Sequence, residues 1–277
     1  YNISNFLIMN QKTRENLELN RNSDDGKKFG SIFWALDECK TFMGKRLLAQ
    51  WINEPLYNKL EIEKRLDGVE ELTKNPEKIE ELDTLLDNLS DISRLSSKLS
   101  NGTISPKELL AIKNTLNIIE KFENLTSNFN SEILKPNSNN EALIDFRDIL
   151  DRTIKDEPSN NIRVGNIIKE GANGVLDSIR GEISIIEEKF ENYEEELIQI
   201  TGIKNLKINY AKNTGYSIDI PILGVKNFKN NIEEFTLKQK LSSMEKYTTK
   251  TLLGLEEKIL SLKLKSYEIE FDTYSKL

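Results

Sequence analysis

Apolar residues between about positions 36 and 150 recur at spacings of three and four, which is the pattern of helices that bury one face. Two such stripes stand out: Ile79, Leu82, Leu86 and Leu89, then Leu109, Ile112, Leu116 and Ile119. Residues 135–140, KPNSNN, form a polar stretch typical of a loop. We therefore predict one mostly helical domain over residues 1–170.

Helix start signals accompany these stripes. SPKE, at residues 105–108, places Pro at the first helical position and spaces Ser and Glu as in a capping box. NKLE, at 58–61, predicts a cap with a reciprocal acid, and NPEK, at 75–78, again puts Pro first. Each segment supplies groups that satisfy or replace unpaired amides of a first helical turn.

The pattern then predicts two long helices, the first over residues 171–201 and the second over 250–277. The first stripe is Ile179, Ile186, Phe190, Tyr193, Leu197 and Ile200; the second is Leu252, Leu255, Ile259, Leu262 and Ile269. Residues 174–200 would span roughly 40 Å at 1.5 Å per residue. Two stripes of this kind favour an antiparallel coiled coil.

Between the two helices, over residues 202–249, the apolar period changes to two. Ile208 and Tyr210 alternate with polar or small residues, and the turn residues NTG follow before a second alternating run. The segments EFTLKQKL and EKYTT, between residues 234 and 249, predict two further strands. The expected fold class is thus mostly α: a helical domain and a long antiparallel helix pair that carries a small antiparallel β domain.

The composition narrows the possible chemistry. The chain has 277 residues, a net charge of -7, one cysteine and no histidine, which excludes an internal disulfide and a zinc site of Cys and His ligands. No Gly-rich phosphate loop and no Ser-His or Cys-His nucleophile pair is present. Paired acids such as Glu187 and Glu188 fit a solvated helix face. We predict no catalytic, metal or cofactor site in this chain.

The distribution of charge is uneven. Residues 201–266 hold twelve Lys and six acids, a net of +6, so the rest of the chain carries -13. A basic tip on an acidic arm is attracted to phosphate while the arm is repelled. Scattered lysines often serve solubility alone, but this local excess favours contacts with the phosphates of a nucleic acid. The candidate DNA-binding residues are Asn213, Lys226, Lys229, Lys238, Gln239, Lys240 and Lys246.

Because this tip contains Lys without Arg, it lacks the fork that reads guanine bidentately. We therefore expect contacts with the DNA backbone that are independent of base sequence and strongly dependent on salt. The alternative is a helical scaffold whose coiled-coil arm binds a protein partner, and a mainly apolar interface of that kind would respond little to salt. No apolar run approaches the roughly 20 residues of a membrane span, so the expected location is the cytoplasm. The expected DNA binding adds association with the nucleoid.

Several stretches together resemble the MutS family of DNA mismatch-repair proteins. They are MNQKTRENLEL from Met9, GSIFWALDECKTFMGKRLLAQWINEPL from Gly30, GNIIKEGANGVLDSIR from Gly165, NLKINYAKNTGYSIDI from Asn205 and KQKLSSMEKYTT from Lys238. The resemblance implies a core domain (1–170), an ascending lever helix (171–201), a clamp (202–249) and a descending lever helix (250–277). It also implies a clamp that contacts the DNA backbone, with Lys238, Gln239 and Lys246 on basic and polar positions of the clamp-return motif.

The same resemblance implies what lies elsewhere in such a protein. The mismatch-reading domain would precede Tyr1 and the ATPase domain, with its ATP and Mg²⁺, would follow Leu277. The full-length protein is then expected to form a homodimer and to work with a MutL-type repair factor. This chain is expected neither to recognise a mismatch nor to hydrolyse ATP. Ser217, where the family usually has an aromatic, and KTLLG at 250–254, in place of a Pro-containing helix start, depart from the pattern.

Overall fold

The protein folds into two compact units, which meet in the sequence between Asp156 and Glu157. The computed structural model describes residues 5–136, 141–225 and 234–277. Within this part of the chain, helices predominate and the strands form one small antiparallel sheet, so the predicted mostly-α fold class is confirmed.

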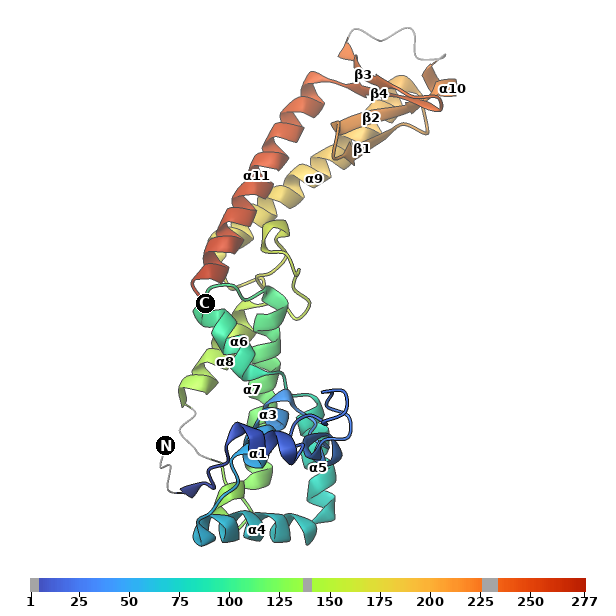
Figure 1. The fold of residues 1–277 in the computed structure, drawn as a ribbon. Coiled ribbons are helices and arrows are strands. Elements are labelled where there is room, and N and C mark those ends of the chain that lie inside the picture. The colour runs from blue at the N-terminus through green and yellow to red at the C-terminus, as the bar shows by residue number, and fades with distance from the viewer. Residues whose placement is uncertain (1–4, 137–140, 226–233) are drawn as a thin grey trace. The chain divides into compact units, whose positions relative to one another are not determined.

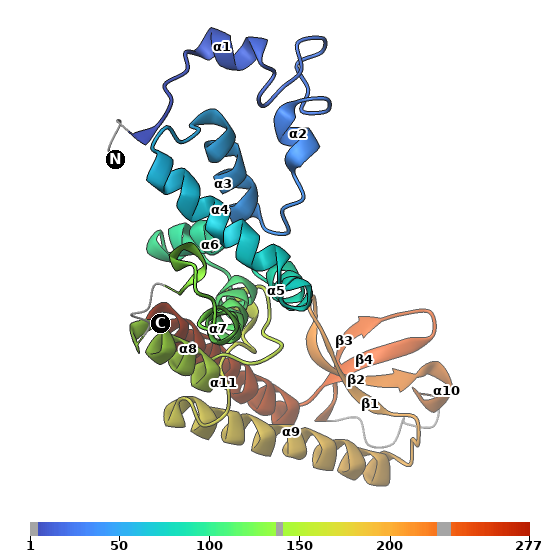
Figure 2. The same ribbon diagram turned by 90° about the horizontal axis from the view of Figure 1, so that it is seen from below.

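The first unit is helical. Its elements are α1 (Gln11–Asn16), α2 (Ile32–Leu36), α3 (Phe42–Asn53), α4 (Lys59–Thr73), α5 (Pro76–Asp87), α6 (Ile92–Ser100), α7 (Pro106–Thr126), the short 3-10 helix η2 (Glu132–Leu134) and α8 (Glu141–Thr153). Helix α7 is central, since α5, α6 and α8 all pack against it, and Figure 2 shows α7 and α8 side by side. Leu109, Ile112 and Leu116 of the predicted stripe are buried there.

The helix starts agree with the sequence to different degrees. At α7 the predicted capping box is complete, because Ser105 Oγ accepts the amide of Glu108 while the Glu108 carboxylate accepts the amide of Ser105 at 3.0 Å. At α4 Asn58 caps the helix as predicted. The reciprocal role predicted for Glu61 is wrong: its carboxylate pairs with Lys64 one turn along at 3.2 Å, an alternative that local sequence also offers.

The capping box of α7 carries a pH-dependent contribution to stability. The Lys98 ammonium, followed by the Ser105 amide, lowers the pKa of Glu108 to about 2. A lowered folded-state pKa stabilises the fold above the ordinary pKa of 4.5, and this contribution disappears as the pH falls from there toward 2. We expect Glu108→Gln to cost about 1–2 kcal/mol at pH 7 and much less at pH 3, as measured by urea unfolding. Glu77→Gln, in the first turn of α5, is the matched control and should change stability by less than about 0.5 kcal/mol.

The second unit is a helix pair that carries the sheet. Its elements are the 3-10 helix η3 (Ile162–Val164), α9 (Gly174–Thr201), β1 (Lys207–Ala211), β2 (Gly215–Pro221), α10 (Ile222–Val225), β3 (Thr236–Lys240), β4 (Met244–Thr248) and α11 (Lys250–Ser275). Figure 1 shows α9 and α11 side by side and running in opposite directions, with the sheet where α9 ends and α11 begins. The predicted long antiparallel helix pair is confirmed.

Most of the predicted stripe residues lie in the seam between the two helices. Ile186, Phe190, Leu252 and Ile259 are buried in one cluster with the apolar side chains of the sheet. Ile200 is an exception, because 56% of it is exposed. An alternating three-four spacing averages 3.5 residues, slightly less than the 3.6 residues of one turn, so the stripe drifts around a straight helix. At Ile200, its last member in α9, the side chain no longer faces α11.

The base of the helix pair is tied by a buried carboxylate. Glu270 of α11 accepts the backbone amide of Ile167 at 2.9 Å and a guanidinium hydrogen bond from Arg180 of α9 at 2.6 Å. Arg180 also donates to the carbonyl of Ile168 at 2.9 Å. These long-range bonds explain why residues 157–170, placed by sequence in the helical domain, belong to the same compact unit as α9 and α11.

Candidate nucleic-acid interface

The four strands form a sheet of order β1-β2-β4-β3, here called the tip sheet. Both strand pairs that the sequence predicted are antiparallel hairpins, with Tyr210 opposite Tyr216 in the first. One face packs on the helix pair: Ile218 and Ile220 are fully buried, and the rings of Phe190 and Tyr216 stack with centroids 4.4 Å apart. The opposite face and the edges are therefore the parts that could meet a partner.

Two helix carboxylates hold the tip sheet to the helix pair. Glu194 of α9 accepts the amide of Ile208 in β1 at 2.6 Å, and Glu256 of α11 accepts the amide of Tyr216 in β2 at 2.9 Å. Gly215 has a φ of +70°, and a side chain there would collide with the Glu256 carboxylate. The turn NTG thus ends in glycine both for its backbone conformation and for this close approach.

The outer face of β2 carries a buried polar cluster. Asp219 accepts hydrogen bonds from Ser217 Oγ at 2.7 Å and from Asn209 Nδ2 at 3.0 Å, and Lys246 Nζ lies 3.3 Å from its carboxylate. Ser217 is fully buried and Asp219 is 8% exposed. The polar face of this alternating strand is therefore packed with its own hydrogen-bonding partners and not left to solvent.

Two of the predicted DNA-binding lysines are mostly buried and are held by several partners within the protein. Lys246 belongs to the cluster around Asp219, and only 13% of its side chain is exposed. Lys238 Nζ donates to the carbonyls of Thr214 and Tyr216 at 3.2 and 2.9 Å and lies 3.6 Å from Glu256. Both ammonium groups stabilise the tip sheet internally, which the sequence did not reveal.

The other predicted residues differ in position. Lys240 is exposed and pairs with Glu245 at 2.7 Å. Gln239 and Asn213 are exposed, on edge strand β3 and in the β1–β2 turn. Lys226 and Lys229 lie outside the described residues.

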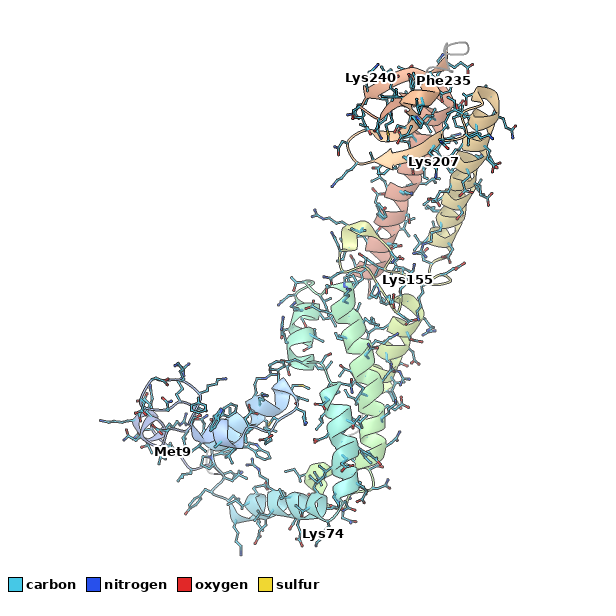
Figure 3. The ribbon with its side chains drawn as sticks, turned by 90° about the vertical axis from the view of Figure 1, so that its right-hand side faces the viewer. Met9, Lys74, Lys155, Lys207, Phe235 and Lys240 are labelled. Carbon is cyan, nitrogen blue, oxygen red and sulfur yellow. The ribbon has the colours of Figure 1, made fainter. Side chains whose placement is uncertain are left out.

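Three further lysines that were not singled out from the sequence are exposed at β1 and its flanks. Lys204 precedes β1, Lys207 is its first residue and Lys212 follows its last. None has an ion-pair partner among the residues that the structure describes. Figure 3 shows Lys207 and Lys240 on the tip sheet, and strand order puts them on its two opposite edge strands. Their signal in the sequence was the lysine spacing in KNLKINYAKN, residues 204–213, which contains the first strand and its flanks.

The acid of the Lys240 pair stays charged over a wide pH range. Hydrogen bonds from Lys240 and then from the Tyr247 hydroxyl lower the pKa of Glu245, and burial together with Glu245 raises the pKa of Tyr247 to about 12. Lys240 therefore faces an ionised carboxylate at neutral pH. The uncompensated positive charge of the described tip sheet comes from the lysines at β1.

Comparison with known proteins places the chain in a family. Residues 12–270 match the family model "MutS domain III". The chain belongs to the MutS family. It is 35% identical over 275 residues to the DNA mismatch repair protein MutS of Clostridium tetani, with 99% of this chain and 31% of that protein aligned. For MutS of Clostridium beijerinckii the identity is 37%, with 99% of this chain and 30% of that protein aligned.

The comparison also shows how much of each relative this chain covers. The chain spans about a third of the length of the curated MutS relatives it matches.

Across the described parts of the chain, no three His, Cys, Asp or Glu side chains are grouped as metal ligands. No helix in the described ranges is long and apolar enough to cross a membrane.

Proposed function

We propose that the tip sheet of this MutS chain contacts the backbone of duplex DNA. The observation that carries the proposal is the set of exposed lysines at β1, Lys204, Lys207 and Lys212, which lack an acidic partner in the described structure. Ammonium groups in this state can pair with phosphates without first giving up an internal ion pair. Asn213 and Gln239 remain in the proposal as exposed polar neighbours.

The acids of the tip sheet support this assignment. Asp219 and Glu245 are buried and each is paired with a lysine of the same sheet. Helix α9, by contrast, carries an acidic run, EEKFENYEEE, at residues 187–196. A phosphate chain would be attracted to the sheet and repelled by the helix, which favours approach at the end of the helix pair.

In this proposal Lys238 and Lys246 support the sheet and do not contact DNA. Each would have to leave two or more internal partners to reach a phosphate. Lys240 is exposed, and its ion-pair partner is the buried carboxylate of Glu245, which also accepts a hydrogen bond from the Tyr247 hydroxyl. Its exchange to a phosphate would therefore break one ion pair and leave Glu245 with Tyr247.

Charge reversal of the lysines at β1 tests the proposal. Lys204, Lys207 and Lys212 are changed together to Glu, and binding to a perfectly paired and a single-mismatch duplex is measured by fluorescence anisotropy at several salt concentrations. We expect the parent chain to bind both duplexes equally and the variant to bind at least about tenfold more weakly, with a salt slope lower by roughly 0.9 for each lost phosphate contact.

The matched control changes Lys107, Lys121 and Lys135 to Glu. These lysines are exposed in the first unit, and the change in net charge is the same. An equal loss of affinity in the control would contradict the assignment to the tip sheet. Absence of salt-dependent binding would favour the scaffold alternative, in which the helix pair binds a protein partner.

The wider role follows from the relatives' name. We propose that the protein containing this chain acts in mismatch repair, with DNA backbone contact as the contribution of this segment. ATP hydrolysis with Mg²⁺, a second subunit and a MutL-type factor belong to the same proposal and to other parts of that protein. The long helix pair would carry motion from a nucleotide-driven domain to the tip sheet, since a small rotation at the base of a rigid arm gives a large displacement at its end.

A further inference from the structure

A polar cavity of about 730 Å³ lies in the first unit, beside α1 and the loop that leads to α2. Its volume falls in the range of small-molecule sites, roughly 300–1,000 Å³. The lining is almost free of apolar side chains. It includes Arg14, Arg21, Gln11, Asn16, Asn20 and Asn53. We call it the α1 cavity, and nothing in the proposed DNA contact uses it.

The two arginines of the α1 cavity are not neutralised by a carboxylate in the described structure. Arg46 and Arg180 pair with carboxylates at 2.7 and 2.6 Å. Arg14 and Arg21 form no ion pair with any residue that the structure describes, and Nε of Arg14 is buried without a hydrogen-bond partner there. A buried donor without an acceptor is unfavourable, so an acceptor oxygen brought by a ligand would stabilise this guanidinium.

The loop behind Arg21 is held in a fixed conformation. The side-chain oxygen of Asn22 accepts the amides of Asp25 and Gly26 at 3.0 and 3.1 Å, and its nitrogen donates to the carbonyl of Phe29 at 2.8 Å. Glu18 has a φ of +51°, uncommon for a residue other than glycine. Arg21 itself makes one long bond, from Nη1 to the Gly26 carbonyl at 3.3 Å. Most of its donors are left for another acceptor on a preformed loop.

The lining of the α1 cavity contains little negative charge. Glu15, the one acid among the residues that line the α1 cavity, accepts a hydrogen bond from Gln11 at 2.8 Å. The Glu18 carboxylate accepts both the amide and the hydroxyl of Ser23. The balance of the lining is thus positive, with two guanidinium groups against one carboxylate.

We propose that the α1 cavity binds the phosphate group of a small molecule. Guanidinium groups present donors in a planar fork that matches the oxygens of phosphate, and they remain charged at all physiological pH values. Two such groups, one with a buried and unpartnered nitrogen, favour a doubly charged oxyanion over a neutral ligand. The volume leaves room for an organic moiety beside the phosphate.

Titration of the whole chain with inorganic phosphate tests the proposal. Binding is measured by calorimetry against chloride at equal ionic strength, and the arginine Nε–H resonances are followed by NMR. We expect the Arg14 and Arg21 signals to shift, and affinity to fall by about tenfold or more in Arg14→Gln and in Arg21→Gln, since one charge-assisted hydrogen bond contributes about 1.5–3 kcal/mol. Arg163→Gln, at an exposed arginine of the second unit, should leave affinity unchanged.

The outcomes separate the possible ligands. A ribose phosphate that binds more tightly than inorganic phosphate, with the same dependence on both arginines, would support a small phosphorylated molecule. Equal binding of glutamate would overturn the preference for phosphate. Binding of duplex DNA through Arg14 and Arg21 without binding of free phosphate would overturn the small-molecule assignment, as would an absence of any shift in the Arg14 and Arg21 signals. Unchanged circular dichroism of the Gln variants would exclude unfolding as the cause of a loss.

Discussion

Replacing Glu270 with alanine is expected to lower the free energy of unfolding by about 3–5 kcal/mol. The side chain is 3% exposed and holds both the Arg180 guanidinium and the Ile167 amide. Removal leaves a partly buried positive charge and a buried amide without an acceptor. Both groups then stay desolvated with no hydrogen bond to Glu270 to offset the loss of water. This is the largest effect that we expect from a single polar side chain in the protein.

Hydrogen exchange followed by mass spectrometry locates the effect. Peptides that contain Ile167 and Ile168 should lose protection in Glu270→Ala, because their anchor to α11 is removed. Glu268→Ala, at an exposed position on the same helix, is the matched control and should stay within about 0.5 kcal/mol. Equal effects of the two substitutions in urea unfolding would show that Glu270 does not anchor the segment.

Truncation of the seam is expected to have the second largest effect. Ile259 is fully buried between α9, α11 and the tip sheet, so Ile259→Ala should cost about 2–5 kcal/mol through lost burial and the cavity left behind. The next residue, Leu260, is 38% exposed. Leu260→Ala truncates a side chain that is already partly in contact with solvent, so it buries less apolar area to begin with and leaves no closed cavity. It should therefore cost much less.

Unfolding in urea, followed by far-ultraviolet circular dichroism, measures both variants. Both tryptophans, Trp34 and Trp51, belong to the first unit, whereas six of the eight tyrosines lie in the second, so tryptophan emission reports the first unit and tyrosine emission mainly the second. The loss in Ile259→Ala should be seen first in the tyrosine signal. Similar midpoints for Ile259→Ala and Leu260→Ala would mean that the seam does not stabilise the helix pair as its burial indicates.

If the proposed DNA contact is made, stability and binding divide one set of lysines in the tip sheet. Its buried acids, Asp219 and Glu245, recruit two of them as internal partners, and Glu256 approaches a third. Without such partners the buried carboxylates would be costly, so the sheet uses part of its positive charge to fold. In the proposed contact, the lysines at β1 remain for the phosphate chain, so a count of all lysines would overstate the proposed surface.

The local sequence was enough to predict the main elements. Three-four spacing located the seam of α9 and α11, the change to a period of two located the tip sheet, and SPKE located the start of α7 with its complete capping box. The quoted family motifs and the charge excess of residues 201–266 are likewise properties of the chain alone. Each of these signals depends on residues within a few positions of one another, where backbone geometry fixes which side chains share a face.

Only the tertiary structure decided which candidate residues are available to a partner. Lys246 meets an acid 27 positions away, Lys238 meets carbonyls 22 and 24 positions away, and Glu270 anchors an amide 103 positions away. The sequence identified the lysines of the tip sheet as a group but could not separate those bound within the fold from those exposed at β1. Pairing across such separations depends on how strands and helices pack, because the pairing energy of a charge is set by burial and by neighbours that the linear pattern does not contain.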